Sequence, residues 1–155
     1  MNPHVLELVP DDVRTFFVDV SRVVENLDEV SLPDGELLSC HMLARAISAR
    51  MHNKKTSSVC LRTKTGFFGG MFTHSWLVAT STQDPFQEEW VIDPYPVGAV
   101  VGSSGGALLW ARIVARSLYE PREKVTTEVL AKPNFRRHVR AASDAVSRTK
   151  KALGL

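Results

Sequence analysis

The spacing of hydrophobic residues changes twice along this chain, and this change limits the possible folds more than any other feature. Residues 10–30 and 36–53 place apolar side chains three and four positions apart, as in an amphipathic helix. Residues 57–93 instead form short runs rich in β-branched and aromatic residues, which are typical of antiparallel strands. Helical spacing returns over 108–120 and 133–155. The sequence therefore predicts an α+β protein in which helices pack on a small antiparallel sheet.

The central segment is expected to supply three or four strands, separated by turn residues. The candidate runs are SSVCLRT (57–63), GFFGGMF (66–72), HSWLVATST (74–82) and EEWVID (88–93), with KTG and TQDPFQ between them. The later stretch VGSSGGA is rich in glycine, which suits a connecting loop. It lacks the Lys-Ser or Lys-Thr pair of a phosphate-binding loop, so it does not predict a nucleotide site.

Composition narrows the class of protein and its setting. The chain has 155 residues, 44% of them hydrophobic, so a single domain over 1–155 is expected. A formal net charge of +2 gives no reason to expect a nucleic-acid partner. No apolar run could span a membrane and no signal-peptide pattern opens the chain, so no membrane association is expected. Two cysteines are too few for a disulfide framework, which favours a cytoplasmic location, with export by a dedicated secretion system left open.

Three residues carry candidate chemistry: Cys40 near the start of the second helix, His74 opening one strand and Asp93 closing the next. A thiol becomes a nucleophile at neutral pH when a helix N-terminus or an imidazolium lowers its pKa. The imidazole in turn needs a partner that fixes its orientation, and a carboxylate can serve. His74 and Asp93 are 19 residues apart, and adjacent antiparallel strands bring such ends side by side. The sequence therefore predicts that a hairpin pairs His74 with Asp93.

The motifs SCHMLARAIS, HSW and WVIDP, in this order, resemble those of the transglutaminase-like superfamily of papain-like cysteine enzymes. The resemblance covers about residues 36–96 and implies a Cys-bearing helix packed on an antiparallel sheet, with helical extensions on both sides. It implies that Cys40 is the nucleophile, His74 the general base and acid, and Asp93 the orienting group. Because the family works through a thioester, it implies acyl chemistry without a cofactor. The small size favours hydrolysis or deamidation of a protein or peptide over crosslinking.

The chain departs from this family in two segments. Related enzymes often place a Gln or Trp before the cysteine to complete the oxyanion hole, and SLPDGELLS contains neither. The hole would therefore rest on the backbone N–H of Cys40 and a second donor, either Ser39 or the main chain of the turn. The polar stretch MHNKKTSS also replaces a segment that usually contains glycine.

Five residues are candidates for binding the substrate. The segment FFGGMF predicts either a strand with a glycine bulge or a flexible lip over the thiol, and the lip is favoured because Gly69 and Gly70 would weaken a buried strand. Trp76 and Trp90 lie two and three residues from His74 and Asp93 and are expected to pack in the core or to wall the cleft. The substrate-binding candidates are Ser39, Phe68, Gly69, Gly70 and Trp76.

Other residues have simpler interpretations. Cys60 is expected to be a small core residue, and His41 and His52 to be surface or helix-end residues. A zinc site at Cys40, Cys60, His74 and Asp93 would lack any close ligand pair, so no metal is predicted.

Three alternatives to hydrolysis stay open. The fold could serve as a binding module whose contact surface is the basic last helix, which carries Arg136, Arg137 and Arg140. The protein could instead be an acyltransferase for a small molecule, or Cys40 could be a regulatory thiol. Nothing in the sequence indicates an oligomeric state.

Overall fold

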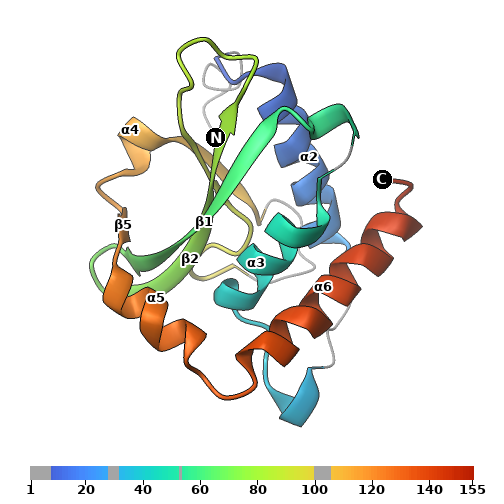
Figure 1. Cartoon of the computed structure of the whole chain (residues 1–155), viewed down its shortest axis with the longest axis vertical. Coiled ribbons are helices and arrows are strands. Elements are labelled where there is room, and N and C mark those ends of the chain that lie inside the picture. The colour runs from blue at the N-terminus through green and yellow to red at the C-terminus, as the bar shows by residue number, and fades with distance from the viewer. Residues whose placement is uncertain (1–7, 28–31, 53, 100–105) are drawn as a thin grey trace.

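The computed structural model describes residues 8–27, 32–52, 54–99 and 106–155. These residues form an α+β fold of five α-helices, two 3-10 turns and one five-stranded antiparallel sheet (Figure 1). The helices are α2 (Asp11–Glu25), α3 (Cys40–Arg50), α4 (Arg112–Ala115), α5 (Glu123–Leu130) and α6 (Phe135–Ala152), and the 3-10 turns are η1 (Pro33–Gly35) and η2 (Lys54–Thr56). The strands are β1 (Val59–Phe68), β2 (Phe72–Ser81), β3 (Trp90–Asp93), β4 (Leu108–Ala111) and β5 (Tyr119–Pro121).

The sheet has the strand order β4-β3-β2-β1-β5, with every pair antiparallel. β1 and β2 form a long hairpin that pairs Val59 with Ser81 at one end and Phe68 with Phe72 at the other. The turn between them contains Gly69 and Gly70 at φ of 62° and 71°, a backbone region that glycine enters without steric cost. This turn places His74 near the start of β2.

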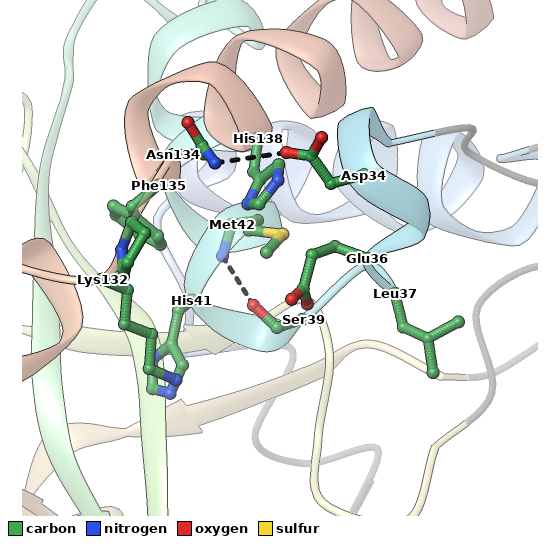
Figure 2. A pocket seen from close by; sticks show the side chains of 11 residues that line it. Asp34, Glu36, Leu37, Ser39, His41, Met42, Lys132, Asn134, Phe135 and His138 are labelled. Carbon is green, nitrogen blue, oxygen red and sulfur yellow. Dashed lines mark hydrogen bonds between the residues drawn. The ribbon is translucent and has the colours of Figure 1, made fainter.

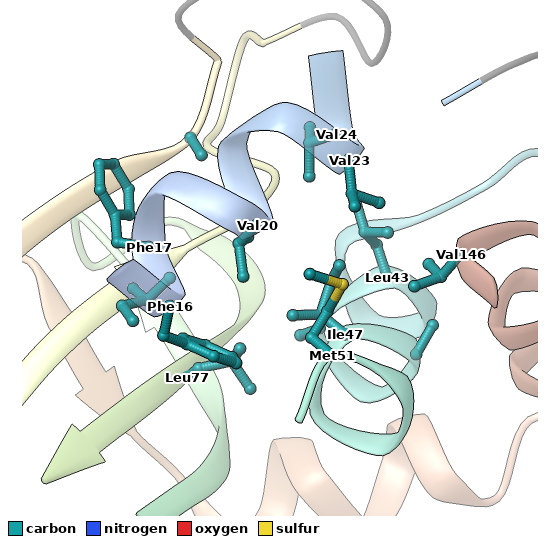
Figure 3. Packing of buried hydrophobic residues seen from close by; sticks show 14 of the residues in the cluster. Phe16, Phe17, Val20, Val23, Val24, Leu43, Ile47, Met51, Leu77 and Val146 are labelled. Atoms are coloured by element: carbon teal, nitrogen blue, oxygen red, sulfur yellow. The ribbon is translucent and has the colours of Figure 1, made fainter. Parts of the chain in front are cut away.

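The main core lies between the sheet and helices α2, α3 and α6. Figure 1 shows α3 between the β1–β2 hairpin and α6. Figure 3 shows how valines and phenylalanines of α2 meet side chains of α3, β2 and α6. The expected apolar stripe of the first helix is confirmed, because its members are all buried: Val13, Phe16, Phe17, Val20, Val23, Val24 and Leu27. Burial of side chains of this size contributes about 1.5–3 kcal/mol each. The apolar face of α2 is therefore held firmly against α3 and the sheet.

A second, smaller cluster covers the opposite face of the sheet. Trp76 and Val78 of β2 and Val91 of β3 pack there against Ala115 of α4 and Tyr119 of β5. The segment after β4 therefore folds back over the sheet, and both faces of β2 are buried. Members of this cluster contact His74 and Asp93, two residues of the site described below.

Two segments differ from the structure that the sequence predicts. Residues 108–120 are not a helix: they form β4, the single turn α4 and the start of β5. Residues 108–111 form a strand because they pair with β3, whose backbone N–H and C=O groups on that edge would otherwise lack partners. The pairing also buries Leu109. The KTG segment, Lys64–Gly66, is not a turn, because β1 runs straight through it.

The start of α3 also corrects the prediction. The helix begins at Cys40 and not at residue 36, and Leu37 is 84% exposed instead of lying on the apolar stripe. Ser39 is the N-cap, and its side chain accepts a hydrogen bond from the backbone N–H of Met42 at 3.3 Å. Cys40 is therefore the first residue of the helix. No helix in the described part of the chain is long and apolar enough to cross a membrane.

Candidate active site

Cys40 lies at the N-terminus of α3, where the helix dipole and the free backbone N–H groups favour a negative charge. Its side chain is partly exposed. Burial raises the pKa of the thiol, but hydrogen bonds and charge from His41 and His74 outweigh that effect and lower the pKa from 9.0 to about 6. At neutral pH the group is therefore mostly a thiolate.

His74 and Asp93 lie on adjacent strands, as the spacing predicts. β2 pairs with β3 through Leu77 and Ile92, and this register puts the two side chains on the same face of the sheet. His74 Nε2 lies 2.8 Å from Asp93 Oδ2, and both side chains are almost completely buried. Burial alone lowers the pKa of His74, but hydrogen bonds and charge from Asp93 and Cys40 raise it from 6.5 to about 9. Between about pH 6 and pH 9, therefore, the imidazole is protonated while Cys40 is a thiolate.

Asp93 has two further hydrogen-bond partners that hold its carboxylate in place. The Tyr119 hydroxyl donates to Oδ2 at 2.8 Å, and the backbone N–H of Tyr95 donates to Oδ1 at 3.2 Å. Together with His74, these donors hold the buried carboxylate in one orientation. The sequence did not indicate Tyr119, because the residue falls in the segment expected to be helical.

Aromatic rings enclose the imidazole of His74. Trp76 is stacked on it at 6.3 Å between ring centroids with an interplanar angle of 17°, and Phe68 approaches edge-on at 5.9 Å. Tyr119 contacts both His74 and Trp76. Trp76 is 1% exposed, so it shields the His74–Asp93 pair from water. Trp90 is equally buried but belongs to the main core.

His41 is not the surface residue that the sequence suggests: it is 6% exposed. Its Nδ1 lies 2.7 Å from Ser75 Oγ on the α3 side of the sheet. Ser75 Oγ is also 2.7 Å from Thr65 Oγ1, and Arg45 donates to both hydroxyl oxygens at 3.2 and 3.0 Å. Arg45 additionally donates to the carbonyl of His41 at 2.9 Å. Four polar side chains thus form one connected network beside Cys40.

A cavity of about 410 Å³ opens next to the first turn of α3 (Figure 2). Ser39 and His41, the two neighbours of Cys40, line it together with Met42. The opposite walls come from the segment around η1 and from the start of α6, and they carry acidic, basic and apolar side chains. These residues are Asp34, Glu36, Leu37, Lys132, Pro133, Asn134, Phe135 and His138.

The remaining candidate residues lie elsewhere. Gly69 and Gly70 are exposed in the β1–β2 turn, next to Phe68, which borders His74. Cys60 is exposed on β1, which corrects the expectation that it lies in the core. The glycine-rich segment 101–105 falls outside the described residues. Within the described part of the chain, no group of three or more His, Cys, Asp or Glu side chains could hold a metal ion.

Comparison with protein-family models, with curated proteins and with solved structures found no match for this chain. The similarity to transglutaminase-like enzymes is therefore carried only by the motifs around Cys40, His74 and Asp93. Any functional assignment depends on the geometry of these residues.

Proposed function

We propose that this protein is a cysteine-dependent acyl-transfer enzyme of the transglutaminase-like, papain-like type. Its substrate is an amide of a protein or peptide, which it hydrolyses or deamidates. One observation carries the proposal: Cys40 has a pKa of about 6 beside His74, whose pKa is about 9 and which is bonded to Asp93. A thiolate facing an imidazolium is the resting form of such enzymes, and purely structural cysteines do not require it.

The proposed reaction has two steps. The Cys40 thiolate attacks the amide carbon, and the C=O electron pair moves onto the oxygen to form a tetrahedral oxyanion. The C–N bond then breaks, its electron pair stays on nitrogen, and His74 gives its proton to the leaving amine. In the second step His74 takes a proton from water, and the resulting hydroxide attacks the thioester. Collapse releases the carboxylic acid and restores Cys40.

The surroundings of the thiol support an amide or peptide substrate. The neighbouring cavity of about 410 Å³ has room for a side chain or a short peptide segment. It offers carboxylates at Asp34 and Glu36, an ammonium at Lys132 and apolar surface at Leu37 and Phe135. Walls of this mixed chemistry suit a peptide chain better than a wholly apolar ligand.

The alkylation of Cys40 by iodoacetamide between about pH 4 and pH 9 tests the proposal. Mass spectrometry follows each cysteine separately, and the exposed Cys60 serves as the internal reference thiol. We expect the alkylation rate of Cys40 to rise through about pH 6, well below the reference thiol, and His74→Ala to remove this advantage. Equal pH profiles for Cys40 and Cys60 would refute the thiolate–imidazolium pair.

A binding module is the second candidate, because α6 exposes three arginines that have no ion pair within the described residues: Arg136, Arg137 and Arg140. A module of this kind would keep its function in Cys40→Ala and lose it on charge reversal of these arginines. An acyl-transfer enzyme would show the opposite pattern.

A further inference from the structure

The proposed chemistry needs a donor that no residue so far supplies. A tetrahedral intermediate carries a negative oxygen, and enzymes usually stabilise it with two preorganised hydrogen-bond donors. The backbone N–H of Cys40, at the N-terminus of α3, can provide one of them. Ser39 Oγ accepts a hydrogen bond from the N–H of Met42 as the N-cap of α3, so the position of its hydroxyl is set by the end of the helix.

The protonation of His41 follows from the hydrogen bonds of its network. Arg45 can only donate, so Thr65 Oγ1 and Ser75 Oγ both accept from it. If the Thr65 hydroxyl donates to Ser75, then Ser75 has accepted twice and its own proton goes to His41 Nδ1. Both hydroxyl donors of the network are then paired. Nδ1 is an acceptor in this arrangement, so the imidazole carries a proton on Nε2.

The reverse arrangement leaves a buried donor without a partner. If His41 Nδ1 donated to Ser75, the Ser75 proton would have to go to Thr65. The Thr65 hydroxyl, in a residue that is 3% exposed, would then have no acceptor among the described residues. An unpaired buried donor is destabilising, so the arrangement with the Nε2–H of His41 is favoured. A doubly protonated His41 also carries a proton on Nε2, so this donor is present in both forms.

The position of His41 suits a role in catalysis. Its imidazole lies near enough to Cys40 to lower the pKa of the thiol, and it lines the cavity beside α3. Figure 2 shows the His41 side chain projecting from the first turn of α3. Nε2 has no oxygen or nitrogen partner among the described residues, whereas Nδ1 is held by Ser75. With Nδ1 held by Ser75, the hydrogen bond of His41 to the Cys40 thiolate comes from Nε2–H, so a fixed imidazole directs one N–H donor toward the nucleophile.

We propose that His41 is the second oxyanion-hole donor, acting with the backbone N–H of Cys40. This inference rests on the proposed function and adds one catalytic residue to it. When the thiolate attacks the carbonyl carbon, the oxygen that receives the electron pair accepts hydrogen bonds from His41 Nε2–H and from Cys40 N–H. No proton leaves His41 during the reaction. Arg45, Ser75 and Thr65 are positioning residues, because they hold His41 in the tautomer that donates from Nε2.

Two reactions of the same thiolate separate this role from a structural one. Acylation by p-nitrophenyl acetate passes through an oxyanion, whereas alkylation by iodoacetamide does not. The p-nitrophenolate group leaves without protonation, so acylation by this ester depends little on His74. Both rates are measured as plateaus above the pKa of Cys40 in each variant, because any change at His41 also shifts that pKa.

Two substitutions at His41 form a matched pair. In His41→Asn the amide oxygen can accept from Ser75 as Nδ1 does, but nothing replaces Nε2. In His41→Gln the longer side chain carries an amide N–H close to the place of Nε2. We expect His41→Asn to lower the acylation plateau by about 10²- to 10³-fold, the usual effect of losing one oxyanion donor. The alkylation plateau should stay near that of the unchanged protein, and His41→Gln should recover part of the acylation rate.

The possible outcomes distinguish this inference from the proposed function. Equal acylation plateaus in the unchanged protein and in His41→Asn would overturn the role of His41 while leaving the thiolate–imidazolium pair intact. Loss of both plateaus in both variants would make His41 a structural residue and overturn the inference as well. If Cys40 of the unchanged protein reacts with neither reagent faster than Cys60, the proposed function fails first and the inference fails with it.

Discussion

We expect Gly66→Ala to disturb both the packing of the sheet and the candidate active site. Gly66 lies near the C-terminal end of β1 and pairs with Pro121 of β5. A Cβ atom at this position would lie 2.0 Å from the carbonyl oxygen of Glu120 and 2.7 Å from the backbone nitrogen of Arg122. Ordinary contact begins at 3.4 Å, so β5 would have to move by about 1.4 Å. The contacting atoms belong to the backbone, and no rotation of a side chain can relieve the clash.

This displacement would reach the site through Tyr119, the first residue of β5. Its hydroxyl bonds Asp93 at 2.8 Å, so a shift of this size breaks the hydrogen bond. Overpacking costs about 1–3 kcal/mol and a lost hydrogen bond to a charged group about 1.5–3 kcal/mol. We therefore expect Gly66→Ala to lower the free energy of unfolding by about 2.5–6 kcal/mol, measured by urea denaturation.

Gly70→Ala is the matched control for this prediction. Gly70 has a φ of 71° and nothing within 4 Å of a built Cβ, so this substitution brings only backbone strain. That strain costs about 1–2 kcal/mol and leaves Tyr119 in place. The close approach of β5 is refuted if Gly66→Ala loses no more stability than Gly70→Ala.

Two further predictions concern the carboxylate and the ion pair. Tyr119→Phe should lower the free energy of unfolding by about 1.5–3 kcal/mol in urea denaturation, because Asp93 loses a hydrogen-bond donor. The control is Tyr95→Phe, which should lower it less, because the hydroxyl of Tyr95 has no partner among the described residues. The pKa of Cys40 is depressed to about 6 on folding and that of His74 is raised to about 9. The stabilisation from Cys40 is thus lost as the pH falls through about 6, and that from His74 as the pH rises through about 9. Both thermal stability and turnover of an amide substrate should therefore be highest between these values. If thermal stability still fell in the same way below about pH 6 in Cys40→Ala, Cys40 would not be the cause of that loss.

Several features of the protein follow from local sequence. The 3.6-residue spacing of Val13, Phe16 and Val20 is enough to predict α2, because one apolar stripe has a single way to face a core. The pairing of His74 with Asp93 follows from the length of the hairpin that joins them, since adjacent antiparallel strands leave few alternatives. Both predictions concern residues that are close in the chain or linked by one turn.

Other features depend on contacts between distant segments, and only the tertiary structure decides them. Residues 108–111 have helical spacing but pair with β3, because an unpaired strand edge would leave buried backbone groups without partners. The role of Gly66 is set by the approach of β5, and that of Tyr119 by a carboxylate 26 residues away. The burial of His41 depends on Ser75, which lies 34 residues further along the chain. Periodicity and motifs determine which segments can be helices or strands and which residues can carry chemistry. The contact of Tyr119 with Asp93 and the position of His41 beside the thiol are decided by packing around the sheet, which no local pattern records.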